Sequence, residues 1–233
     1  YYDRAIRFAA GRYGDKPELG KLVDEAVAYA KKIEDKADSN SKLARICEFL
    51  REAKTYELIL TIADQISDRP LAEFKKFEAY SAQKDWEKAI ARLNDVEGMG
   101  DDKWKARAMN ARADTFAEMG RYEEAIKLYQ VINQPPRTLW SIQECYRKWG
   151  KLEDALRTLT EIENSFPDEA SKAAWQKAEY LDKAKEREKA IAQARRIMKV
   201  YPKSEASSKA HQLLEKYGIK TGGGVTDGAE GGN

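Results

Sequence analysis

The residues of this chain that could do acid–base or nucleophilic chemistry are few and scattered. Its one histidine, His211, lies in "SEASSKAHQLLEKYG" without a nucleophile beside it, which favours a helix-surface position over a general base. The two cysteines, Cys47 and Cys145, are far apart and lack metal-ligand spacing, as is typical of buried thiols. No phosphate-binding loop, nucleophile elbow or zinc pattern is present. The sequence therefore predicts no enzyme, no cofactor and no metal.

Acids and aromatics form the one regular chemical pattern. A small or aliphatic residue recurs at intervals of 30, 36, 30 and 35 residues, as Ile59, Ala89, Ala125, Ala155 and Ala190. Eleven residues before these stand the acids Glu48, Glu78, Asp114, Glu144 and Glu179, and fifteen before them stand Ala44, Phe74, Asn110, Trp140 and Trp175. Because the two offsets differ by four, both columns would share one helix face. Such a face would select a basic or amphipathic protein segment.

The same residues also have a purely structural interpretation. Three of the acids have a cation three or four residues further on, in the pairs Glu144 with Lys148, Glu179 with Lys183 and Glu48 with Arg51. Pairs of this kind contribute about 0.3 to 0.5 kcal/mol each on a helix surface. The tryptophans can equally serve packing between repeats. Both interpretations are open at this level.

Composition narrows the classes of partner. The chain has 233 residues, of which 42% are hydrophobic and 35% charged, and its 42 basic residues nearly balance 40 acidic ones. A net charge of +2 gives no general attraction to nucleic acid, and the acids offset the mixed basic and aromatic stretch "PPRTLWSIQECYRKWGK". No apolar run approaches the roughly 20 residues of a membrane span. A protein or peptide partner is expected.

Apolar residues recur at spacings of three and four throughout, which predicts amphipathic helices. Proline and glycine interrupt the pattern at Pro70, Gly98 to Gly100, Gly120, Pro135 with Pro136, Gly150, Pro167 and Pro202. Helices of this length are marginal alone in water and must bury a shared face. The chain is thus expected to be a run of helical hairpins.

Two stretches repeat one phrase, with a turn glycine, a bulky apolar residue, two acids and an alanine: "GRYEEAIKLYQVI" and "GKLEDALRTLTEIENSFP". The matching positions are Gly120, Tyr122, Ala125 and Tyr129 in the first, and Gly150, Leu152, Ala155, Leu159 and Pro167 in the second. "REKAIAQARRIMKVYP" keeps Ala190, Ile197 and Pro202 without a turn glycine. With a period near 34 residues, the pattern resembles the tetratricopeptide repeat of the bacterial type, from about Leu71 to Pro202 and more weakly from Ser41. A generic helical-hairpin solenoid is the alternative.

The resemblance implies an all-α solenoid of about five to six helix-turn-helix repeats with a C-terminal capping helix. We expect a degenerate N-terminal hairpin over 1–40, repeats over 41–202, a capping helix over 203–218 and a glycine-rich tail over 219–233. Gly120 and Gly150 should form turns, because left-handed backbone is cheap only for glycine. Ala89, Ala125, Ala155 and Ala190 should lie at helix crossings, where a small side chain lets helices approach.

In tetratricopeptide proteins the first helix of each hairpin lines the concave groove, and the resemblance implies the same here. The candidate partner-binding residues are Phe74, Glu78, Asn110, Asp114, Trp140, Glu144, Trp175 and Glu179. Members that hold acidic chaperone tails use Lys, Arg and Asn in this groove. Here only Asn110 fits and five acids oppose it, which excludes that subclass. The predicted function is a non-enzymatic protein-interaction scaffold.

A self-assembling structural subunit is the alternative function. The opening "YYDRAIRFAAGRYG" resembles the second helix of a hairpin whose first is missing, so head-to-tail stacking of solenoid ends could form oligomers or filaments. The chain lacks an initiator methionine, so it is either a processed mature chain or a cut fragment. Its location is unknown, and an extracytoplasmic one is favoured by a small margin.

Overall fold

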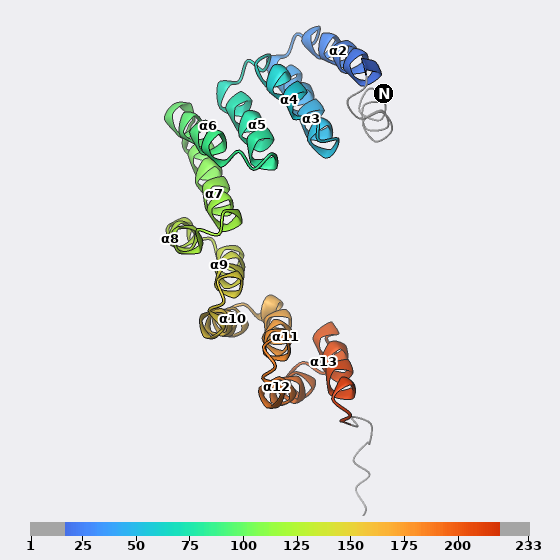
Figure 1. The fold of residues 1–233 in the computed structure, drawn as a ribbon, viewed down its shortest axis with the longest axis vertical. Coiled ribbons are helices and arrows are strands. Elements are labelled where there is room, and N and C mark those ends of the chain that lie inside the picture. The colour runs from blue at the N-terminus through green and yellow to red at the C-terminus, as the bar shows by residue number, and fades with distance from the viewer. Residues whose placement is uncertain (1–16, 220–233) are drawn as a thin grey trace, which may run out of the picture. The chain divides into compact units, whose positions relative to one another are not determined.

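The computed structural model of the chain describes residues 17–219, and over that range it contains twelve α-helices and no strand (Figure 1). The predicted all-α fold is confirmed. The N-terminal stretch on which self-assembly rests, up to residue 16, and the tail from residue 220 lie outside the described residues. The domain division stays a prediction, and its boundary between residues 40 and 41 falls inside a helix, Lys36–Glu52.

The chain divides into two compact units, Tyr1–Leu128 and Tyr129–Asn233. The described helices of the first unit are α2 (Pro17–Lys31), α3 (Lys36–Glu52), α4 (Tyr56–Ala63), α5 (Arg69–Ala82), α6 (Trp86–Met99) and α7 (Asp102–Glu118). The boundary falls within α8 (Tyr122–Ile132), and the second unit continues with α9 (Arg137–Lys148), α10 (Leu152–Ser165), α11 (Pro167–Lys183), α12 (Arg187–Val200) and α13 (Glu205–Lys216). Within each unit, consecutive helices pack against each other, α3 to α7 in the first and α9 to α13 in the second.

One turn geometry joins the two helices of every hairpin from α3 to α12. Three residues separate the helices, and the middle one has a positive φ: Lys54 (61°), Lys84 (60°), Gly120 (78°), Gly150 (79°) and Lys185 (63°). The amide after each of them donates to the carbonyl five residues earlier, as in Arg121 to Phe116 at 2.8 Å. This pattern satisfies carbonyls that the helix end leaves open. The structure thus places Gly120 and Gly150 in left-handed turns, and it puts lysine in three equivalent turns.

The small or aliphatic column lies five residues after each left-handed residue. Its members are 0% exposed, except Ile59 at 1%. The second helix of each hairpin therefore packs closely on adjacent helices at this position, and an alanine permits the closest approach of the two helix backbones. In the first unit Ala89 belongs to the same core cluster as Phe74 and Phe77 of α5.

The break expected from Gly98 to Gly100 is shorter than predicted. Helix α6 continues through Gly98 to Met99, and only Gly100 ends it. A Cβ on Gly100 would lie 2.5 Å from the Cβ of Trp104 and 2.7 Å from the carbonyl oxygen of Val96. Gly100 thus lies in the short link between α6 and α7, where a side chain would collide with Trp104 of α7 and with the last turn of α6.

Buried charge joins hairpins in the second unit. The side chain of Glu163 on α10 is 2% exposed and accepts from Arg196 of α12 at 2.6 Å, Lys177 of α11 at 3.3 Å and the Tyr201 hydroxyl at 3.0 Å. Several donors compensate the desolvation cost of a buried carboxylate. Removing one of them would leave charge without a partner in a low-dielectric interior, which costs free energy. Glu163 therefore ties three consecutive helices together.

We expect substitutions at the left-handed turn residues to change stability in opposite directions, with glycine raising it and alanine lowering it. Lys84→Gly should stabilise the fold by about 0.5 kcal/mol, since left-handed backbone costs an L-residue about 1–2 kcal/mol and glycine's larger unfolded-state entropy offsets part of the gain. Gly120→Ala should cost about 1 kcal/mol, because the turn is open but its φ is unfavourable. Denaturant unfolding of both variants measures these changes. Changes of the same sign in both would contradict the turn assignment.

The alanine column should be intolerant of enlargement. Ala155→Leu adds three heavy atoms at a position that is 0% exposed, and it should lower stability by about 1 to 3 kcal/mol through overpacking. The matched control is Ala28→Leu on the exposed side of α2. Thermal melts that place both variants at the parent's midpoint would show that the helix crossing is not tight.

Candidate protein-binding site

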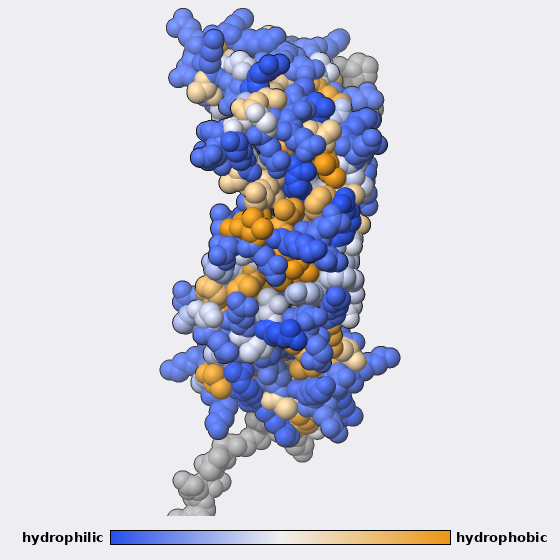
Figure 2. All heavy atoms as spheres, turned by 90° about the vertical axis from the view of Figure 1, so that its left-hand side faces the viewer, coloured by the Kyte–Doolittle hydropathy of each residue, from blue (hydrophilic) through white to orange (hydrophobic). Residues whose placement is uncertain are grey.

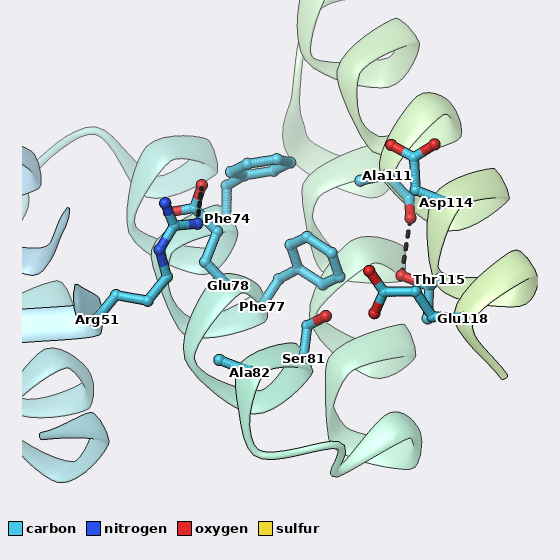
Figure 3. Close-up of a pocket in the computed structure, with 10 residues that line it drawn as sticks. All are labelled: Arg51, Phe74, Phe77, Glu78, Ser81, Ala82, Ala111, Asp114, Thr115 and Glu118. Carbon is cyan, nitrogen blue, oxygen red and sulfur yellow. Dashed lines mark hydrogen bonds and ion pairs between the residues drawn. The ribbon is translucent and has the colours of Figure 1, made fainter. Parts of the chain in front are cut away.

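A hollow of about 390 Å³ opens on the first helices of consecutive hairpins in the first unit (Figure 3). It is lined by Arg51 from α3, by Phe74, Phe77, Glu78, Ser81 and Ala82 from α5, and by Ala111, Asp114, Thr115 and Glu118 from α7. Helix α5 packs against both α3 and α7. The hollow therefore lies over α5, with its neighbours forming the two sides.

Helical periodicity explains which side chains reach the hollow. Along α5 the lining residues 74, 77, 78 and 81 follow the spacing i, i+3, i+4 and i+7, and along α7 the residues 111, 114, 115 and 118 repeat it. This spacing places side chains in one stripe on a helix. Each helix thus presents one stripe to the hollow, and Figure 3 shows the two stripes facing each other.

Two phenylalanines form the apolar part of the hollow. The rings of Phe74 and Phe77 lie 5.3 Å apart between centroids, and Trp104 lies 5.8 Å from Phe74. The guanidinium carbon of Arg107 lies 4.1 Å from the Phe74 ring centre, within cation–π range. Phe74 and Phe77 are only 5% and 7% exposed, so each offers a small and rigid part of its ring to the hollow.

Glu78 is held by two cations of very different character. Its Oε2 accepts from Nζ of Lys75 at 2.9 Å, and the Lys75 side chain is only 3% exposed. Lys75 also donates to Glu48 of α3 at 3.0 Å. The other oxygen, Oε1, lies 3.7 Å from the guanidinium of Arg51, which is 45% exposed. One oxygen is thus fixed by a buried hydrogen bond and the other makes a loose ion pair at the surface.

The charge of the hollow is mainly negative. Asp114 and Glu118 of α7 are exposed and lie across from Glu78, while Arg51 is the one cation among the lining residues. The Thr115 hydroxyl donates to the carbonyl of Ala111 at 2.7 Å and so is turned to its own helix. Three carboxylates beside two aromatic rings make a surface suited to a cation carried on an apolar segment.

The structure brings three of the eight predicted binding residues together in this hollow: Phe74, Glu78 and Asp114. Asn110 lies one turn before Asp114, where its Nδ2 donates to the carbonyl of Ala106 at 2.8 Å and its Oδ1 is buried without a partner. Sequence reasoning missed Arg51, Phe77 and Glu118. Phe77 lies three residues after Phe74, and Glu118 lies four residues after Asp114, so helical periodicity predicts both on the same face.

The ion pair expected between Glu48 and Arg51 does not form. Each residue pairs across to α5 instead, Glu48 with Lys75 and Arg51 with Glu78. The buried ammonium of Lys75 draws both carboxylates toward it, because an unpaired buried charge would be far more costly than a lost surface pair.

The remaining predicted residues lie in the second unit, where the acids have partners on their own helices. Glu144 pairs with Arg147 and, at 3.8 Å, with Lys148. Glu179 pairs with Lys183 at 2.7 Å and accepts from Gln176. Both acids make the ion pairs within one helix that the structural interpretation expects, as Glu78 does with Lys75, and a binding role for them stays a prediction.

The two predicted tryptophans of this unit differ in surroundings. The ammonium of Lys172 lies 4.5 Å from the ring centre of Trp140, and both side chains line a shallow hollow of about 560 Å³ with Glu144. Nε1 of Trp140 is buried without an acceptor. Trp175 packs against the cluster formed by α11, α12 and α13. Trp175 therefore contributes to packing between hairpins.

Hydrogen bonding and burial shift the pKa values of several side chains. The hydrogen bond from Arg147 holds the pKa of Glu144 below its ordinary value of 4.5. Burial raises the pKa of Tyr180, which donates to Gln143 at 2.9 Å, to about 12. Burial also raises the pKa of the Cys47 thiol to about 12, and both cysteines are buried. A reactive thiolate is therefore not favoured at Cys47.

Other kinds of site find no support within residues 17–219. No group of three or more His, Cys, Asp or Glu residues in that range could hold a metal ion. None of the helices described there combines the length and apolar character needed to cross a membrane. Charged and polar side chains cover most of the face that Figure 2 displays, with apolar side chains in smaller patches between them.

The comparisons with known proteins are limited. No protein-family model matches the chain, and no curated protein matches it. The solved tetratricopeptide-repeat domain of P58(IPK) aligns over 87% of this chain and 69% of its own length, with 19% identity and a TM-score of 0.34. A signal-transduction ATPase of the STAND class with a tetratricopeptide-repeat sensor, from Pyrococcus horikoshii, aligns over 90% of this chain and 36% of its own, with 18% identity and a TM-score of 0.30.

We expect the contribution of Glu144 to stability to depend on pH. Because its folded pKa lies below the ordinary value, the ion pair stabilises the fold above about pH 4.5 and this contribution is lost as the pH falls through the lowered pKa. Glu144→Gln should therefore melt below the parent at pH 7, and the difference should shrink toward pH 3. Glu161→Gln, at an exposed position of α10, controls for loss of a carboxylate. A difference that stays constant over this pH range would contradict the ion-pair assignment.

Proposed function

We propose that the chain is a non-enzymatic scaffold that binds a segment of another protein on the first helices of its hairpins. The observation that carries the proposal is the hollow over α5, where Phe74 and Phe77 lie beside the carboxylates of Glu78, Asp114 and Glu118. An apolar surface with adjoining fixed charge is the usual composition of a groove that takes an amphipathic segment.

The charges select the chemistry of the partner. The lining carboxylates outnumber the cation, so a lysine or arginine of the segment gains attraction while an acidic segment is repelled. The buried ammonium of Lys75 offsets part of the charge of Glu48 and Glu78, but Asp114 and Glu118 keep the balance of the hollow negative. The segment is therefore basic and carries an apolar side chain next to its cation.

Binding can be measured with three synthetic peptides of equal length and equal leucine content. One carries arginine four residues from each leucine, and in the other two glutamine or glutamate replaces the arginine. Isothermal titration with the intact chain should detect the arginine peptide, a weaker glutamine peptide and no glutamate peptide. Affinity for the arginine peptide should fall as salt rises, because the attraction is screened. Equal binding of all three, or none by any, would contradict the proposal.

Paired charge variants locate the surface. Asp114→Asn with Glu118→Gln removes two charges from the hollow, and Glu144→Gln with Glu179→Gln removes two charges from the second unit. The first pair should slow association of the arginine peptide on the order of threefold to tenfold at low salt, with little change in dissociation. The second pair is the matched control. An equal effect of both pairs would mean that the overall charge of the chain attracts the peptide, and it would contradict binding at the hollow.

A further inference from the structure

We infer that Arg51 occupies the place of a partner's cation at Glu78, and that the two compete for the same carboxylate oxygen. This inference rests on the proposed function and adds to it a residue of the chain itself that limits affinity. Figure 3 shows Arg51 entering the hollow from α3 and reaching Glu78 on α5, next to the two phenylalanines.

The two carboxylate oxygens of Glu78 have different partners. Oε2 is held by Lys75 at 2.9 Å, and a lysine that is 3% exposed cannot be exchanged for a cation from solvent. Oε1 points to Arg51 at 3.7 Å, which lies beyond the range of about 2.7–3.2 Å for an N–H···O hydrogen bond. Glu78 is thus held in orientation by one cation, while its other oxygen is only loosely paired.

Arg51 is exposed to solvent, and its ion pair with Glu78 is weak. Its side chain is 45% exposed, so it can swing into water at little desolvation cost. A surface ion pair of this kind is worth little, since solvent and salt screen it. A partner's cation that is carried beside an apolar side chain gains a further contact on the small exposed parts of Phe74 and Phe77, and it can displace Arg51 from Oε1.

Arg51 also affects which cationic segments can bind in the hollow. While Arg51 stays at Glu78, it neutralises part of the field of the hollow and disfavours lone cations. A segment that brings both an apolar side chain and a cation overcomes this competition, because burial on the rings adds to the charge attraction. Arg51 therefore lowers the affinity of both kinds of segment, and the amphipathic one binds in spite of it because of its extra apolar contact.

The test compares Arg51→Gln with a matched charge loss elsewhere. Lys42 lies nine residues before Arg51, on the opposite side of α3, and makes an ion pair of similar length, 3.8 Å, at similar exposure, 47%. At about 0.15 M salt, where screening acts over about 8 Å, Arg51→Gln should lower the Kd for the arginine peptide about twofold to fivefold, and Lys42→Gln should leave it unchanged. Arg51→Lys, which keeps the charge, should bind like the parent.

A direct readout accompanies affinity. The Arg51 Nε–Hε resonance in ¹⁵N spectra, assigned by its loss in Arg51→Lys, should shift toward its solvent position on addition of the arginine peptide and stay in place with the glutamine peptide. If the arginine peptide binds but Arg51→Gln and Lys42→Gln behave alike and the resonance does not move, competition is refuted and the proposed function stands. If the arginine peptide does not bind the parent chain or Arg51→Gln, the proposed function itself fails.

Discussion

The left-handed residue between paired helices is the constraint on which the rest of the structure depends. It reverses the chain in three residues at each hairpin turn from α3 to α12, and a buried small or aliphatic side chain follows five positions later. The start of each second helix is thereby fixed relative to the end of its first helix. Within the first unit this repetition brings equivalent stripes of α5 and α7 to face each other, and the hollow with its aromatic and acidic sides results.

The fold was predictable because its signals are local. Periodic apolar residues, proline and glycine breaks and the regular alanine column identify the hairpins, and Gly120 and Gly150 mark their turns. The equivalent turns at Lys54, Lys84 and Lys185 were not visible, since lysine has no preference for left-handed backbone. Gly98 predicts a break but lies inside α6, because a glycine by itself does not distinguish a loop from the interior of a helix.

The candidate site was predictable only in part, because charge pairing depends on distances between helices. The column of acids predicted that Glu78 and Asp114 share a face, and both line the hollow. It could not show that Lys75 is buried between Glu48 and Glu78, since α3 and α5 meet only in the fold. Partners within one helix, such as Glu179 with Lys183, are set by spacing and were therefore accessible to sequence reasoning. Binding by any of these residues stays a prediction.

The constancy of the hairpin turn also determines where such a chain can change its length. Each turn from α3 to α12 has three residues between helices, whereas the junctions between hairpins range from a single residue at Phe166 to the five residues 64–68. The first helices vary as well, from twelve residues in α9 to seventeen in α11. Insertions and deletions that accumulate during evolution would therefore be absorbed at the junctions and helix starts. A change of one residue inside a turn would rotate the following helix by about 100° and bring a polar face into the core.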